Sequence, residues 1–61
     1  MRIRELRERR GISQSELARR MGVKHPSVVQ WETGKAMPAK LPKLAEVLGV
    51  EIGELFDRAS A

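Results

Sequence analysis

The stretch Gln14–Thr33 reads QSELARRMGVKHPSVVQWET and holds two short helical patterns separated by Gly22. Ala18 is small, which allows the two helices to cross closely, and a glycine permits the positive φ of a sharp turn. Val28 and Trp31 lie three residues apart on one side of the second helix, where they would pack against the first. The stretch therefore predicts two helices joined by a tight turn, with the second helix buried along one side.

Start and stop signals set the limits of the first of these helices. Ser13 and Glu16 have the S-x-x-E spacing of a capping box, and Ile12 and Leu17 stand where a hydrophobic staple closes. We therefore expect this helix to begin near residue 14 and to end at Gly22. Its buried residues should be Leu17, Ala18 and Met21.

The second helix has a weaker start signal. Pro26 is tolerated in a first helical turn, so it permits a start at Lys24 or His25, although neither residue is a good N-cap. We expect this start to depend on tertiary packing and, in a complex, on a phosphate near Lys24. Gly34 ends the helix.

The helical wheel divides this second helix into two sides. At about 100° per residue, an inward side holds Val28, Trp31 and Glu32. The opposite side has no evident packing role, and its members are Pro26, Val29, Gln30 and Thr33. Arg7 falls on the inward side of an earlier helical stripe over residues 2–10. A buried charge needs a partner, so we predict an ion pair between Arg7 and Glu32.

Further helical patterns make the chain all-α, with five helices in one domain spanning residues 1–61 and an ordered core of about residues 2–57. A fourth helix is predicted over about residues 41–48, ended by Gly49. A short fifth helix should follow Val50 and end near Asp57, with residues 58–61 frayed. The two aromatic residues, Trp31 and Phe56, are assigned to the core.

Composition and charge narrow the class of function. The chain has 61 residues, no cysteine and a net charge of +4. By segment the charge is +3 over residues 1–10, +2 over 11–35, +1 over 36–50 and −2 over 51–61, which sums to +4. This distribution suits a polyanion bound on one side. The absence of cysteine agrees with a reducing cytoplasm, and the absence of any long apolar run predicts a cytoplasmic protein with no membrane contact.

Enzymatic and metal chemistry find no support in the residue types present. The sequence has one histidine, no cysteine and no tyrosine, and its serines at positions 13 and 27 are explained by helix starts. We expect no catalytic residues, no metal site and no cofactor. Single-stranded RNA binding is disfavoured because it relies on exposed aromatic platforms.

Nearly the whole chain, from Ile3 to Phe56, resembles the five-helix DNA-binding domain of lambdoid-phage repressors and Cro proteins, the XRE family, in which a helix-turn-helix lies at helices 2 and 3. The residues that carry the resemblance are Ile3, Leu6, Arg7, Arg10, Gly11, Ile12, Ser13, Gln14, Glu16, Leu17, Ala18, Gly22, Val23, Val28, Trp31, Glu32, Gly34, Lys35, Leu44, Ala45, Leu48, Gly49 and Val50.

The resemblance implies a sequence-specific regulator of transcription, a repressor, that binds double-stranded DNA through its third helix in the major groove. Such a protein would be associated with the nucleoid. Gln14 takes the place of a family glutamine that contacts phosphate and braces that helix. Base contacts fall on His25, Pro26 and Gln30, and we add Val29 from its outward position. Phosphate contacts are expected from the polar and basic residues around them, namely Ser13, Gln14, Arg10, Lys24, Thr33, Lys35 and Lys40.

The chain departs from the family at Pro26, where glutamine or serine is usual and proline offers no side-chain donor. Two copies are expected on a pseudo-palindromic operator as a weak homodimer or a dimer formed on DNA. Its contact surface is predicted at the loop over residues 37–40 and near Ile52 and Gly53. Two alternatives stay open: an antitoxin that binds both operator DNA and a toxin, and an excised or engineered domain of a longer repressor.

Overall fold

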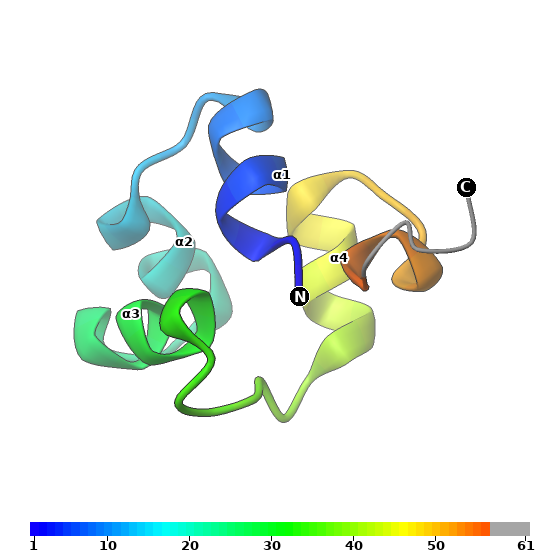
Figure 1. The fold of residues 1–61 in the computed structure, drawn as a ribbon. Coiled ribbons are helices and arrows are strands. Elements are labelled where there is room, and N and C mark those ends of the chain that lie inside the picture. The colour runs from blue at the N-terminus through cyan, green and yellow to red at the C-terminus, as the bar shows by residue number, and fades with distance from the viewer. Residues whose placement is uncertain (57–61) are drawn as a thin grey trace.

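The computed structural model describes residues 1–56, all of whose regular elements are helical. Figure 1 shows their order as α1 (Ile3–Arg10), α2 (Gln14–Met21), α3 (His25–Thr33), α4 (Leu41–Leu48) and a 3-10 helix, η1 (Ile52–Leu55). Helices α2 and α3 lie on one side of the molecule and α4 and η1 on the other, with α1 between them (Figure 1). The predictions for the end of the last helix near residue 57 and for residues 58–61 lie outside the described residues.

A single core joins the five elements. Every element contributes buried apolar side chains, and these are Ile3, Leu6, Leu17, Ala18, Met21, Val28, Trp31, Leu44, Ala45, Leu48 and Leu55. Ala18 is 4 % exposed, so a small side chain stands where α2 and α3 approach each other. Among residues 1–56, no helix has both the length and the apolar character needed to cross a membrane.

The turn between α2 and α3 follows the predicted glycine geometry. Gly22 has a φ of 72° and ends α2 in the left-handed conformation that favours glycine. The amide of Val23 donates to the carbonyl of Ala18 at 2.9 Å, which satisfies one of the free carbonyls at the end of α2. This compact stop directs the chain into α3 after two further residues.

The two helix starts differ as the sequence indicates. Ser13 caps α2, since its Oγ accepts a hydrogen bond from the amide of Glu16 at 3.0 Å. The Glu16 carboxylate, which a full capping box would direct to the Ser13 amide, instead accepts from Arg19 and Arg20. Helix α3 begins at His25 without a side-chain cap on its N-cap residue Lys24, so packing holds its first turn.

The predicted fifth helix is a 3-10 helix of four residues rather than an α-helix. Its start is as expected, because the amide of Glu51 donates to the Glu54 carboxylate at 3.1 Å. The chain leaves the helix at Phe56 in an extended conformation, which turns this side chain outward, and Phe56 is 41 % exposed. The assignment of Phe56 to the core is therefore wrong, and Leu55 is the buried residue of this element.

Candidate nucleic-acid interface

Helix α3 presents the outward side that the wheel predicts. Pro26, Gln30 and Thr33 are exposed, and Val29 is 37 % exposed. On the opposite side Val28 is fully buried and Trp31 is 8 % exposed, so the helix is held from behind by core packing. The outward side is therefore free to meet another molecule without disturbing the fold.

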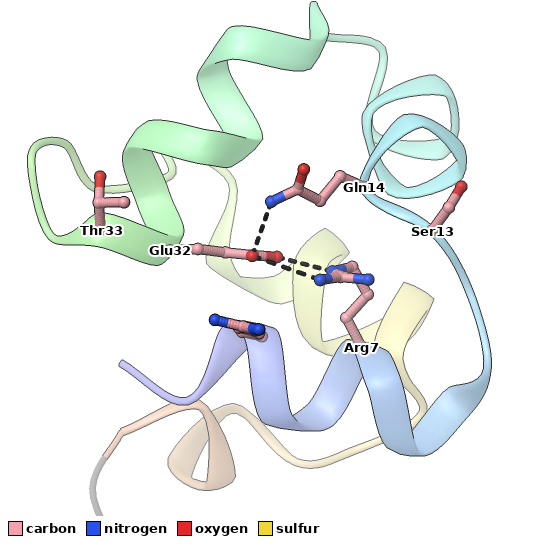
Figure 2. Close-up of a pocket in the computed structure, with 6 residues that line it drawn as sticks. Arg7, Ser13, Gln14, Glu32 and Thr33 are labelled. Atoms are coloured by element: carbon pink, nitrogen blue, oxygen red, sulfur yellow. Dashed lines mark hydrogen bonds and ion pairs between the residues drawn. The ribbon is translucent and has the colours of Figure 1, made fainter.

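An ion pair fastens α3 to α1. The Nε of Arg7 donates to Oε2 of Glu32 at 2.7 Å, and Nη2 donates to the other carboxylate oxygen at 3.4 Å. Arg7 also donates from Nη1 to the carbonyl of Ile12 at 2.9 Å, which holds the chain between α1 and α2. Figure 2 shows both side chains pointing into the junction of the three helices.

Gln14 extends this pair to α2. Its Nε2 donates to Oε1 of Glu32 at 2.9 Å, and Figure 2 shows its side chain directed at the same carboxylate. At the other end of its amide, Oε1 of Gln14 lies 3.0 Å from Nε2 of His25, at the start of α3. Gln14 therefore braces α3 at two points, seven residues apart.

The buried carboxylate of Glu32 stays ionised in this setting. Its side chain is 5 % exposed, and burial alone would raise its pKa. The hydrogen bonds from Arg7 and Gln14 and the positive charges of Arg7 and Arg4 together outweigh burial, so the pKa of Glu32 lies below its ordinary value. The charged carboxylate thus bonds both Arg7 and Gln14 in the unliganded protein.

A shallow open depression of about 480 Å³ lies where α1, the start of α2 and the end of α3 meet. The residues lining it are Arg4, Arg7, Ser13, Gln14, Glu32 and Thr33. It brings three of the predicted phosphate contacts together: Ser13, Gln14 and Thr33. The Thr33 hydroxyl donates to the carbonyl of Val29 at 2.9 Å, which leaves its oxygen lone pairs able to accept.

Besides Arg7, which is paired with Glu32, α1 contributes Arg4 to this depression, a residue that the sequence does not single out. The predicted residue, Arg10, lies elsewhere: it lines a second depression with Leu48 and Gly49. Arg4 and Arg10 are each three residues from Arg7 and fall on either side of it around the helix. The sequence alone does not say which of these sides faces α3, so periodicity could not separate the two arginines.

The lysines differ from the arginines in their pairing. Among residues 1–56, the ion pairs use arginines of α1 and α2 or the residue before α1, and no lysine takes part. Lys24 precedes α3 and Lys35 follows it, and both are exposed. Lys40, also exposed, lines a small apolar depression beside Trp31 on the back of α3. Free positive charge therefore stands at both ends of the outward helix.

Comparison with known proteins supplies the family. The sequence model described as helix-turn-helix matches residues 3–55. A protein named as an uncharacterized HTH-type transcriptional regulator from Archaeoglobus fulgidus is 42 % identical over 57 residues, covering 90 % of this chain and 81 % of that protein. A second protein with the same name and source is 40 % identical over 57 residues, covering 90 % of this chain and 80 % of that protein.

Proposed function

The chain belongs to the XRE-type helix-turn-helix family of DNA-binding transcriptional regulators, and on that premise we propose that it is a repressor that reads a specific operator through α3. The observation that carries this proposal is the exposed outward side of α3, on a helix that the core and the Arg7–Glu32 pair hold from behind. A rigid helix with a free face is what direct readout of base edges requires.

The size and charge of α3 fit a major groove. Its nine residues span about 13 Å at 1.5 Å per residue, close to the groove width of about 12 Å. Lys24 and Lys35 bracket the helix, so each lysine would meet the phosphates on one wall of the groove. Lys40 would add a weaker contact from the loop before α4.

The base contacts we propose fall on the outward side of α3 and its first residue. Gln30 can bond adenine at N6 and N7 with both ends of its amide. Val29 offers methyl groups to the methyl group of a thymine, and Pro26 offers only an apolar surface and its shape. His25, in the first turn, can reach a base edge while Gln14 holds its other side.

The depression between α1, α2 and α3 is the phosphate seat we propose. Ser13 caps the amide of Glu16, which leaves the amides of Gln14 and Ser15 as donors at the N-terminus of α2, a position that favours an anion. Ser13, Gln14 and Thr33 surround that point. Arg4 provides the charge: its exposed side chain pairs with Glu8 at 3.2 Å, and a phosphate would compete for that surface pair. For α1 we therefore propose Arg4 as the phosphate contact in place of Arg10.

Two copies would bind a pseudo-palindromic operator with half-sites about 34 Å apart. The surface we propose between them is the exposed apolar part of the loop at Met37, which is 64 % exposed, together with Ile52, which is 42 % exposed. A bound pair covers the operator against other proteins, and repression is the regulatory result we propose.

Binding-site selection from random duplexes, repeated with two variants, tests the proposal. The wild-type protein should enrich a two-fold symmetric motif. Gln30→Ala should relax the preference at one base pair per half-site, with a loss of about 1–3 kcal/mol there. Lys35→Ala should weaken binding to every duplex alike and reduce the salt dependence of binding. Recovery of no enriched motif from the wild-type protein would defeat specific recognition.

A further inference from the structure

The side-chain amide of Gln14 has its orientation decided by Glu32. Both carboxylate oxygens of Glu32 accept hydrogen bonds, Oε2 from Arg7 and Oε1 from Arg7 and Gln14. An ionised carboxylate has no hydrogen to donate, so the amide of Gln14 must present its NH₂ group to it. The carbonyl oxygen of the same amide is therefore the end that faces His25.

This orientation settles which ring nitrogen of His25 carries the proton. The Gln14 carbonyl oxygen can only accept, so His25 Nε2, 3.0 Å away, must be the donor. In a neutral imidazole one nitrogen donates and the other accepts, which leaves Nδ1 without a hydrogen. Within residues 1–56 no group bonds Nδ1, and His25 is exposed in the first turn of α3. The acceptor nitrogen is therefore available to a ligand.

The hydrogen bonds from Glu32 through Gln14 to His25 form a relay. We propose that this relay makes His25 a proton-switched reader of bases. Its Nδ1 accepts a hydrogen bond when the ring is neutral and donates one when the ring is protonated. The inference rests on the proposed function and names a determinant of its specificity. In the major groove, Nδ1 of a neutral ring would accept a hydrogen bond from the amino group at adenine N6 or cytosine N4. Nδ1 of the imidazolium would instead donate a hydrogen bond to guanine N7 or O6.

Charged groups of both signs lie near His25. The Glu32 carboxylate stands behind Gln14 and is itself paired with Arg7 of α1. Lys24 is the preceding residue, and His25 is the first residue of α3. Imidazoles as a class change charge between about pH 5 and pH 8, which sets the pH values at which the switch is tested.

The first test needs no DNA. His25 is the single histidine in the chain, so long-range proton–nitrogen NMR spectra of the free protein report its ring alone. Above about pH 7.5 the neutral ring should be the tautomer protonated at Nε2. Gln14→Ala should turn this single form into a mixture while circular dichroism stays helical. A ring protonated at Nδ1 in the wild-type protein would overturn the relay.

The second test compares base preference at two pH values. Duplexes of the selected operator, varied at the base pair nearest His25, are titrated at about pH 5.5 and about pH 8. The ratio to follow is that of cytosine over guanine, because adenine presents an acceptor at N7 as well as a donor at N6. This ratio should fall by about fivefold or more at the lower pH, the factor that one hydrogen bond supplies. His25→Gln keeps a donor for Gln14 but does not titrate, and its ratio should be the same at both pH values.

The outcomes separate the inference from the function on which it rests. Specific binding with an unchanged ratio at both pH values would overturn the proton switch and leave the regulator intact. An equal gain in affinity for all duplexes at low pH would place the imidazolium on a phosphate, which also contradicts base reading. Absence of specific binding at either pH would refute the proposed function itself.

Discussion

Glu32 connects three elements through one carboxylate. It belongs to α3, accepts from Arg7 of α1 and Gln14 of α2, and through Gln14 it reaches His25. Helical periodicity places Arg7 and Glu32 on inward sides, because that inference needs only the position of each residue on its own helix. The two bonds of Gln14 depend on how α2 crosses α3, which no single-helix pattern contains. Sequence alone therefore predicts the ion pair but not the relay.

Removing either partner of this pair should destabilise the protein strongly. Arg7→Ala and Glu32→Ala each leave an uncompensated buried charge, at a cost of about 3–5 kcal/mol. The double variant should lose less than the sum of the two, because neither charge then remains. Urea unfolding, monitored by the fluorescence of the buried Trp31, measures the free energy of unfolding of the two single variants and the double variant. Additive losses would show that the pair contributes no coupling energy.

The pH dependence of stability should reveal the same carboxylate. The pKa of Glu32 is lower in the folded state than in the unfolded chain, so unfolding takes up a proton as the pH falls. Its contribution is complete above the unfolded pKa and is lost on acidification, below about pH 5. Glu32→Gln should be less stable than wild type at pH 7 and should lose less on acidification. Parallel curves for the two proteins would contradict this.

The acid sensitivity that remains in Glu32→Gln has an identified source. Hydrogen bonds from Arg19 and then Arg20 lower the pKa of Glu16 to about 2. That carboxylate lies at the surface of α2, where solvent and salt screen its partners. Added salt should therefore reduce the residual pH dependence of the variant while leaving the Glu32 contribution of the wild type largely unchanged.

At the scale of elements, local sequence signals predict the bounds of a helix wherever a cap or a glycine stop acts within one turn. Helices α2 and α4 have the expected positions because Ser13 and the glycines that follow them act on neighbouring residues. These signals do not predict the type of η1, since the same start signals serve α-helices and 3-10 helices alike. An α-helical pattern continued past Leu55 places Phe56 in the core, but the helix ends before it.

The cap of α2 gives a prediction with a matched control. Ser13→Ala removes the acceptor that satisfies the Glu16 amide and should lower the free energy of unfolding by about 1 kcal/mol. Ser15→Ala changes an exposed serine in the first turn of the same helix and should alter stability by a few tenths of a kcal/mol at most. Equal effects in thermal or urea unfolding would mean that the Ser13 bond does not stabilise the helix start.

At the scale of the whole molecule, the two ends of the described chain are joined away from α3. The amide of Arg2 donates to the carbonyl of Leu55 at 2.7 Å, and its guanidinium donates to the carbonyl of Glu54 at 3.2 Å. The start of α1 is therefore tied to η1, which lies on the side of the molecule away from α2 and α3 (Figure 1). The segment charges predict that one side meets a polyanion, but they do not say which elements share a side; that arrangement is visible only in the fold (Figure 1).

The spacing of half-sites tests how two copies would meet. If α3 enters the groove as proposed, half-sites about 10 base pairs apart place both copies on the same face of the duplex. A spacing of about 15 base pairs turns the second copy to the opposite face, so any contact between copies is lost. Sedimentation and titration should therefore give cooperative binding of two copies at the first spacing and independent binding at the second.

The exposed side chain of Met37 provides the molecular control for this experiment. If it packs against the second copy, Met37→Ala should remove on the order of 1 kcal/mol of apolar burial. The factor by which the first bound copy strengthens binding of the second should then fall about fivefold. Affinity for a duplex with a single half-site should stay unchanged, because the loop then has no partner. Loss of single-site affinity would instead place Met37 against DNA, and full cooperativity in the variant would move the contact to another surface.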